Sequence, residues 1–331
     1  MKKNFSVILA LAVFSGCLKD DINVPSDIEL SSGVEFLKYL EEQGDYINTP
    51  EVPSLIDAAE VYANLQNYLI IDVGTNGEFV NGHIQGAVNV NNTELLNFIL
   101  TGNAASYQKI VLVSQDGQSS AYYTCLLRLY GFNNVYTMKF GMAYWNMDFS
   151  QVWLQKIKDS PNLNFYTTED YPKNQFKDLP SVFEGSSGGI QELAKQRIAS
   201  FIARGFIDWV DDIEETAVGN SIYLVCYGKS VLYEEGHPPN TVFYLESEHL
   251  KSVKDLQTMP PDKEILIYDY NGQLSAAVTA YLQVLGYNAK SFLFGANQLI
   301  YSSMAYGLDT RLRPYAFLPE EINNFPYVTG E

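Results

Sequence analysis

The residues best placed to do chemistry lie in a polar loop that follows a short apolar run. Ile110-Val111-Leu112-Val113 predicts a buried strand, and a helix is expected from about Ser120 to Tyr130. Loops at the carboxyl ends of parallel strands are where such sheets hold their ligands. The loop itself consists of Ser114, Gln115, Asp116, Gly117, Gln118 and Ser119. A serine hydroxyl is a poor nucleophile without a base beside it, and no histidine lies in or next to this loop.

The second half of the chain repeats this arrangement at an offset of 154 or 155 residues. Six anchors share the offset, among them the pairs Gly82-His83 with Gly236-His237 and Phe140-Gly141 with Phe294-Gly295. A period of this length indicates tandem domains rather than a solenoid. The corresponding second loop consists of Asp269, Tyr270, Asn271, Gly272, Gln273 and Leu274.

Each half alternates strands with helices. This pattern predicts an α/β fold with two tandem domains, each a parallel sheet flanked by helices on both faces. Residues 159–187 are rich in Pro, Asn, Asp and Lys, as is typical of a linker. The tail is expected to pack back through Tyr315, Phe317 and Phe325. The expected segments are a signal peptide at 1–16, a tether at 17–30, domain 1 at 31–158, the linker at 159–187, domain 2 at 188–312 and a tail at 313–331.

Motifs in the first half resemble those of the rhodanese-like family. They occur in the family's order over about residues 54–148, and the repeat extends the resemblance more weakly over about 200–300. The motifs are Ile71-Asp72-Val73, Glu78-Phe79, Gly82-His83-Ile84, Gly86-Ala87, Asn89, the strand–loop–helix, Leu129-Tyr130-Gly131-Phe132, Asn134-Val135, Gly141-Met142 and Trp145. The resemblance implies a fold like that of the two-domain thiosulfate sulfurtransferases.

The resemblance also implies a cysteine at the end of the key strand. That thiolate carries sulfur as a persulfide, while backbone N–H groups of the loop and basic side chains hold the anion. Here Ser114 and Asp269 stand at the cysteine positions, and neither loop contains a basic residue. At about 6 Å and an effective dielectric near 20, the Asp269 charge would repel an anion by roughly 3 kcal/mol. We therefore expect no catalytic residue and no sulfurtransferase activity.

The first residues predict a secretory signal. Met1-Lys2-Lys3 precedes an apolar run that is too short to span a membrane. Val13-Phe14-Ser15-Gly16-Cys17 resembles the bacterial lipobox, which implies cleavage before Cys17 and lipidation of that residue. Lys19-Asp20-Asp21 resembles a tag that directs lipoproteins to the outer face of the outer membrane. The expected location is therefore the bacterial cell envelope, with an anchor in the outer membrane and possible surface exposure.

The composition excludes nucleic acid as a partner. The net charge of −18 repels polyanions and anionic membrane surfaces, so a lipid rather than charge would hold the protein to its membrane. No Cys-x-x-Cys pair occurs, and no metal or other cofactor is expected.

Two cysteines remain besides Cys17. Cys125 is expected to be a small buried hydrophobe in its helix. Cys226 ends a neighbouring strand, where burial is the favoured interpretation and a reactive thiol near the site the alternative.

Histidine and tyrosine give weaker indications. His83 and His237 are expected to shape equivalent turns through local hydrogen bonds. His249 has acidic neighbours but no second histidine near it, so a metal site there is not favoured. Tyr122-Tyr123 and Tyr268-x-Tyr270 fit either packing or an aromatic contact patch for a partner or glycan.

These features favour a non-catalytic binding or accessory lipoprotein whose loops serve as recognition surfaces, partnered with another envelope protein. The first alternative is a divergent sulfur-handling enzyme that uses Cys226. The second is a structural surface component that assembles with copies of itself.

Overall fold

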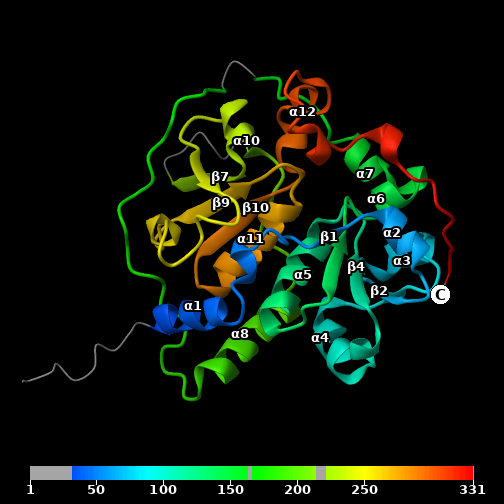
Figure 1. The fold of residues 1–331 in the computed structure, drawn as a ribbon, viewed down its shortest axis with the longest axis horizontal. Helices are drawn as coiled ribbons and strands as arrows, with labels where there is room; N and C mark the ends of the chain where they lie inside the picture. The colour runs from blue at the N-terminus through cyan, green and yellow to red at the C-terminus, as the bar shows by residue number, and fades with distance from the viewer. Residues whose placement is uncertain (1–31, 163–165, 214–220, 331) are drawn as a thin grey trace, which may run out of the picture. The chain divides into compact units, whose positions relative to one another are not determined.

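The protein contains two five-stranded sheets with the same strand order. The computed structural model describes residues 32–162, 166–213 and 221–330 (Figure 1). The first sheet has the order β1-β5-β4-β2-β3 and the second the order β6-β10-β9-β7-β8. Every strand pair in both sheets is parallel. The α/β prediction with two parallel sheets is confirmed.

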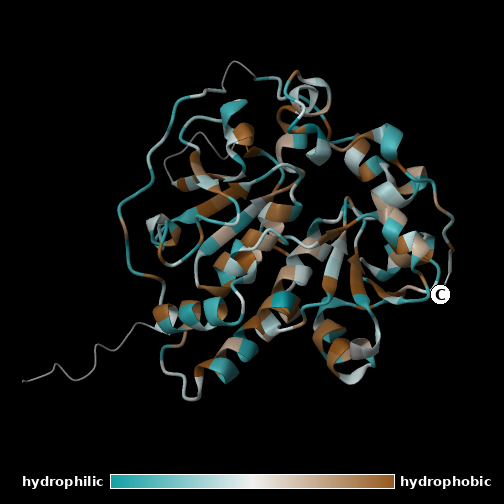
Figure 2. Ribbon diagram, in the orientation of Figure 1, coloured by the Kyte–Doolittle hydropathy of each residue, from teal (hydrophilic) through white to brown (hydrophobic). Residues whose placement is uncertain are grey.

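The strands are short and rich in β-branched residues, which suits a parallel sheet buried on both faces. Those of the first sheet are β1 (Leu55–Ile56), β2 (Tyr68–Asp72), β3 (Val88–Asn89), β4 (Lys109–Val113) and β5 (Val135–Met138). Those of the second are β6 (Trp209–Val210), β7 (Ile222–Gly228), β8 (Val242–Leu245), β9 (Glu264–Tyr268) and β10 (Asn288–Phe292). Figure 2 shows the strands mostly in hydrophobic colours.

Helices follow most strands. They are α1 (Ser32–Glu42), α2 (Ala58–Ala63), α3 (Asn76–Asn81), α4 (Asn92–Thr101), α5 (Gln118–Tyr130), α6 (Met142–Trp145), α7 (Gln151–Leu154), α8 (Ile190–Arg204), α10 (Ser230–Glu234), α11 (Gln273–Val284) and α12 (Tyr301–Tyr306). Capping is clearest at α3, where the Thr75 side chain accepts from the Glu78 N–H and Glu78 accepts in return from the Thr75 N–H.

The two central helices, α5 and α11, pack against each other and join the two sheets into one core (Figure 1). Both lie after the loops singled out above. Every residue of α11 is buried, including its polar ones. A helix that is buried all round must satisfy its polar side chains within the protein, which explains the hydrogen bonds described below.

The segment between α7 and α8 has no helix or strand among its described residues, and Figure 2 colours much of it as hydrophilic. Tyr171 forms an isolated bridge with Val242 of β8, and Thr167 forms one with His237 before that strand. Contacts group residues 31–331 as one unit, and the domain boundaries at 158, 187 and 312 stay predictions.

The C-terminal tail packs back onto the protein through aromatic rings, as expected. Phe317 is fully buried and lies parallel to Trp153 with ring centroids 5.0 Å apart. Phe325 stacks on Tyr62 at 4.2 Å, and Tyr315 stacks on Tyr270 at 3.9 Å. Burial of such rings contributes both apolar area and aromatic contact energy.

Candidate functional site

The two loops occupy equivalent places in the two sheets. The first runs from the end of β4 to the start of α5, and the second runs from the end of β9 to the start of α11. Each turns into its helix through a glycine with positive φ, 86° at Gly117 and 84° at Gly272. Gln118, Ser119, Gln273 and Leu274 therefore lie in the first turns of the helices rather than in the loops.

Ser114 stands at the position of a nucleophile, but its hydroxyl is held by three hydrogen bonds within the protein. Its Oγ accepts from the N–H of Gly117 at 3.1 Å and of Ser120 at 3.4 Å, and it donates to Ser120 Oγ. The side chain is only 3% exposed. No histidine or carboxylate contacts this oxygen among the described residues, so nothing there could remove its proton.

Asp269 fills the equivalent position of the second loop with its own charge. One carboxylate oxygen accepts from the Gly272 N–H at 2.6 Å, and the other accepts from the Leu274 N–H at 3.0 Å. These are the backbone donors of a loop that curls around the strand end. The carboxylate thus takes the place that an anion would need in this loop.

Burial shifts the titration of this group. Asp269 is completely buried, and desolvation raises its pKa from about 3.8 to about 6 against the opposing effect of its hydrogen bonds. Asp72, at the end of β2, is also buried and its pKa is raised to about 6 for the same reason.

Two glutamines cross between the loops. Gln118 accepts from the N–H of Phe294, which follows β10, at 2.7 Å. Gln273 accepts from the N–H of Phe140, which follows β5, at 2.9 Å. The Gln273 amide also donates to the carbonyls of Gly117 and Met138. Each half therefore inserts one amide into the loop region of the other.

Glycine makes this crossing possible. A Cβ at Gly272 would collide with Oε1 of Gln118, and one at Gly117 would lie 2.6 Å from Nε2 of Gln273. The first-loop carboxylate of Asp116 supports the same arrangement, because it accepts from both the backbone and the side-chain amide of Gln118. Burial raises the pKa of Asp116. The loops are thus built into the contact between the two sheets.

The second loop is almost completely buried, and its role as a recognition surface stays a prediction. Its side chains are at most 6% exposed, with Asp269 and Gln273 completely buried. In the first loop, Gln115, Asp116 and Ser119 are partly exposed. Sequence position alone did not reveal this, because burial here comes from the other half of the repeat.

A cavity of about 580 Å³ adjoins the second loop. It is lined by the segment 50–55 and by Lys229, Glu246, Tyr270 and Tyr315, among others. Among the described residues that line it, Lys229 is the basic one, and its Nζ lies 2.7 Å from Tyr315 Oη and 3.8 Å from Glu246. These four residues could not be grouped from the sequence, because they come from four separate segments.

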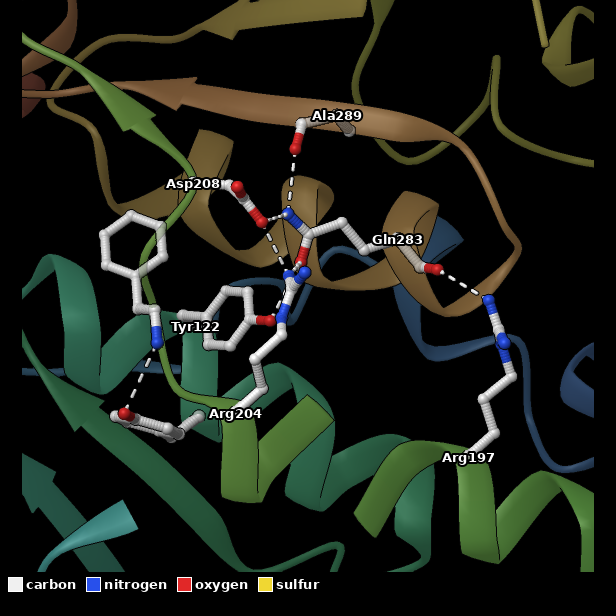
Figure 3. A network of polar contacts seen from close by, with 8 residues as sticks. Tyr122, Arg197, Arg204, Asp208, Gln283 and Ala289 are labelled. Carbon is white, nitrogen blue, oxygen red and sulfur yellow. Dashed lines mark hydrogen bonds and ion pairs between the residues drawn. The ribbon is translucent and has the colours of Figure 1, made fainter. Parts of the chain in front are cut away.

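A second polar network, also missed from the sequence, lies away from the loops (Figure 3). Gln283 of α11 accepts from Tyr122 at 2.9 Å and from Arg204 at 2.7 Å, and donates to Asp208 and to the Ala289 carbonyl. It joins α5, α8 and α11. We interpret it as structural, because every member is engaged with another part of the protein.

The cysteines are both free and completely buried. Burial raises the pKa of Cys226 to about 12, so its thiolate is scarce at neutral pH. The favoured interpretation of Cys226 as a buried strand residue is confirmed. Cys17 lies outside the described residues.

The histidines and tyrosines behave as structural residues. His83 bonds to the Phe79 carbonyl at 2.8 Å, and His237 bonds to the Pro238 carbonyl at 3.1 Å, which confirms their turn-shaping role. His249 lies 3.2 Å from Asp255. Tyr122, Tyr123, Tyr268 and Tyr270, beside the loops, are buried, which favours a packing role over an exposed contact patch. Within the described ranges, no group of three metal-binding side chains occurs, and no helix could cross a bilayer.

The buried carboxylates predict an unusual pH dependence of stability. An acid whose pKa is raised by folding binds its proton more tightly in the native state, so the free energy of unfolding falls as the pH rises from about 4 to about 6. Two pKa units correspond to about 3 kcal/mol per group as an upper limit. Asp72→Asn should remove the contribution of Asp72 to this pH dependence. Urea unfolding at pH 4.5 and at pH 7.5 would measure it, as a smaller difference between the two free energies of unfolding. Asp57→Asn, at an exposed aspartate, is the control and should leave the dependence unchanged.

Comparison with known proteins gives a consistent assignment for the first half. The model of the rhodanese-like domain matches residues 57–148. Thiosulfate sulfurtransferase GlpE from Shewanella oneidensis is 38% identical over 80 residues, which covers 23% of this chain and 74% of that protein.

Solved structures show lower overall similarity. A rhodanese-like domain from Anabaena sp. is 25% identical and covers 27% of this chain and 70% of its own, with a TM-score of 0.24. A thiosulfate sulfurtransferase from Pseudomonas aeruginosa is 13% identical and covers 90% of this chain and 70% of its own, with a TM-score of 0.26. Given the match of the family model and the identity to GlpE over most of that protein's length, this chain belongs to the rhodanese-like family.

Proposed function

We propose that this protein is a non-catalytic binding or accessory lipoprotein of the bacterial cell envelope, built on rhodanese-like domains that have lost sulfur transfer. The observation that carries the proposal is the Asp269 carboxylate, which occupies the backbone N–H donors of its loop. Sulfur transfer needs a thiolate at this place and an anion beside it. Asp269 supplies neither, and its charge repels the anion.

The first loop supports the same proposal. Ser114 lacks a base and is held by three hydrogen bonds, so neither half offers an activated nucleophile. The alternative enzyme that uses Cys226 has no support, because that thiol is buried and its pKa is raised to about 12. Nothing specific favours self-assembly.

The envelope location rests on the lipobox around Cys17. In this proposal Cys17 carries lipid and anchors the protein in the outer membrane, while the partner is another envelope protein.

The experiment is a mild-detergent pull-down of the lipidated protein from its own envelope, followed by mass spectrometry. The proposal predicts that the protein fractionates with the membrane and brings down a stoichiometric partner, whereas Cys17→Ser releases it to the soluble fraction. Two results would count against the accessory role. One is wild-type protein in the soluble fraction, and the other is a pull-down that recovers no partner even after cross-linking.

A further inference from the structure

The cavity beside the second loop has the features of a ligand site. Its volume of about 580 Å³ lies in the range of small-molecule pockets. Two serines that line it, Ser54 and Ser247, have φ of 61° and 59°, a conformation that non-glycine residues rarely adopt. Such backbone strain concentrates at ligand-binding positions.

The charges that line the cavity are already paired. Glu246 lies 3.8 Å from Lys229, and Glu51 lies 3.3 Å from Arg128, which is buried behind the wall. Asp269 is the remaining carboxylate, and it is completely buried by its own loop. A strongly charged ligand would therefore be attracted by one member of each ion pair and repelled by the other. This arrangement favours an uncharged ligand.

The exposed charged side chains that line the cavity favour a ligand with polar groups. The side chains of Lys229 and Glu51 are 55% and 64% exposed, and covering them with an apolar molecule would strip their hydration without replacing it. A ligand that carries many hydroxyl groups can donate to the carboxylates and accept from the ammonium at once.

Apolar surface is present beside these groups. The half-buried ring of Tyr315 stacks on Tyr270 and has the Lys229 ammonium 5.4 Å from its centroid. The Tyr270 hydroxyl donates to Glu246 and accepts from the Lys229 N–H, so the aromatic pair is fixed in place. Leu55, which also lines the cavity, is 36% exposed. The part of the Tyr315 ring that stays exposed and the Leu55 side chain suit the C–H groups of a sugar ring, while the charged pairs suit its hydroxyl groups.

We infer that this cavity binds an uncharged saccharide of one to three rings. The inference rests on the proposed non-catalytic role, because a site that transferred sulfur would have to admit an anion here. The saccharide would lie between the segment 50–55 and Tyr315, with its hydroxyl groups toward Lys229 and Glu246.

The test is isothermal titration of the intact mature chain with neutral trisaccharides (maltotriose, cellotriose and tri-N-acetylchitotriose), alongside thiosulfate and spermidine as charged probes. We expect at least one trisaccharide to bind with a Kd below about 1 mM, and Tyr315→Ala to weaken that binding about tenfold or more. Leu55→Arg, at the cavity wall but with an exposed side chain, should block binding without unfolding the protein. Tyr306→Ala, at an exposed tyrosine of α12, is the matched control and should bind as the wild type does.

Three results would overturn the inference: no trisaccharide binds, a charged probe binds in their place, or binding survives both Tyr315→Ala and Leu55→Arg. None of these results bears on the proposed loss of catalysis, which a sulfur-transfer assay tests separately. Conversely, sulfur transfer by the wild-type chain would overturn the proposed function whatever the cavity binds.

Discussion

Iodoacetamide is expected to alkylate Cys226 at least about a thousandfold more slowly than it alkylates an exposed thiol. The thiolate is the reacting species, and a pKa about three units above the ordinary value of a thiol lowers its population about a thousandfold at neutral pH. Complete burial of the side chain slows the reaction further, because the reagent must wait for a local opening.

The measurement is a time course of peptide modification by mass spectrometry on a mature chain with Cys17 replaced by Ser. Cys125 provides an internal reference, since it is also buried and its pKa is also raised. Both cysteines should react at unfolded-chain rates in concentrated guanidinium. Rapid modification of Cys226 alone in the native protein would revive the alternative of a divergent sulfur-handling enzyme.

Gln273→Ala is expected to lower the free energy of unfolding by about 3 kcal/mol. The Gln273 amide bonds to three buried backbone groups of the first half, the Phe140 N–H and the carbonyls of Gly117 and Met138. The two carbonyls also accept from the N–H groups of Ala121 and Gly141, whereas the Phe140 N–H would lose its bond to Gln273. A buried N–H left without a partner costs about 1–3 kcal/mol, the two lost bonds to the carbonyls add to this, and water that enters the new space would recover part of it. Urea unfolding followed by tryptophan fluorescence would measure the change.

Gln273→Glu separates hydrogen bonding from volume. The glutamate is almost isosteric, but it places an oxygen against the Gly117 and Met138 carbonyls, so we expect a loss at least as large as for alanine. Gln118→Ala should cost less, since Gln118 serves one backbone group of the other half. Gln191→Ala, on the exposed face of α8, is the control with little expected change. Equal stability of Gln273→Ala and Gln191→Ala would show that the crossing does not hold the halves together.

The sequence was sufficient to predict the alternation of strands and helices in each half and the position of both loops, but not the two-residue edge strands β1 and β6. Apolar runs such as Ile110 to Val113 and the glycines that end each loop act locally, so their patterns are readable without tertiary information. The repeat then predicted that the second sheet would copy the first. The identical strand orders agree with this.

The burial of the loops was not predictable in the same way, because it depends on how the two halves contact each other. A signal was present: the dipeptide Gly-Gln occurs at the same repeat position in Gly117-Gln118 and Gly272-Gln273. Only the structure shows that these amides are exchanged between the halves. The network around Gln283 had no such signal, since its members are scattered over α5, α8, α11 and the segment before β6.

The central claim is that a built-in carboxylate has replaced sulfur chemistry in this protein. The most direct measurement is thiocyanate formation from thiosulfate and cyanide by the purified mature chain, beside an active thiosulfate sulfurtransferase as assay control. The account predicts a rate no higher than that of buffer alone, at pH 6 and at pH 8. Catalytic formation of thiocyanate by the wild-type chain would contradict it.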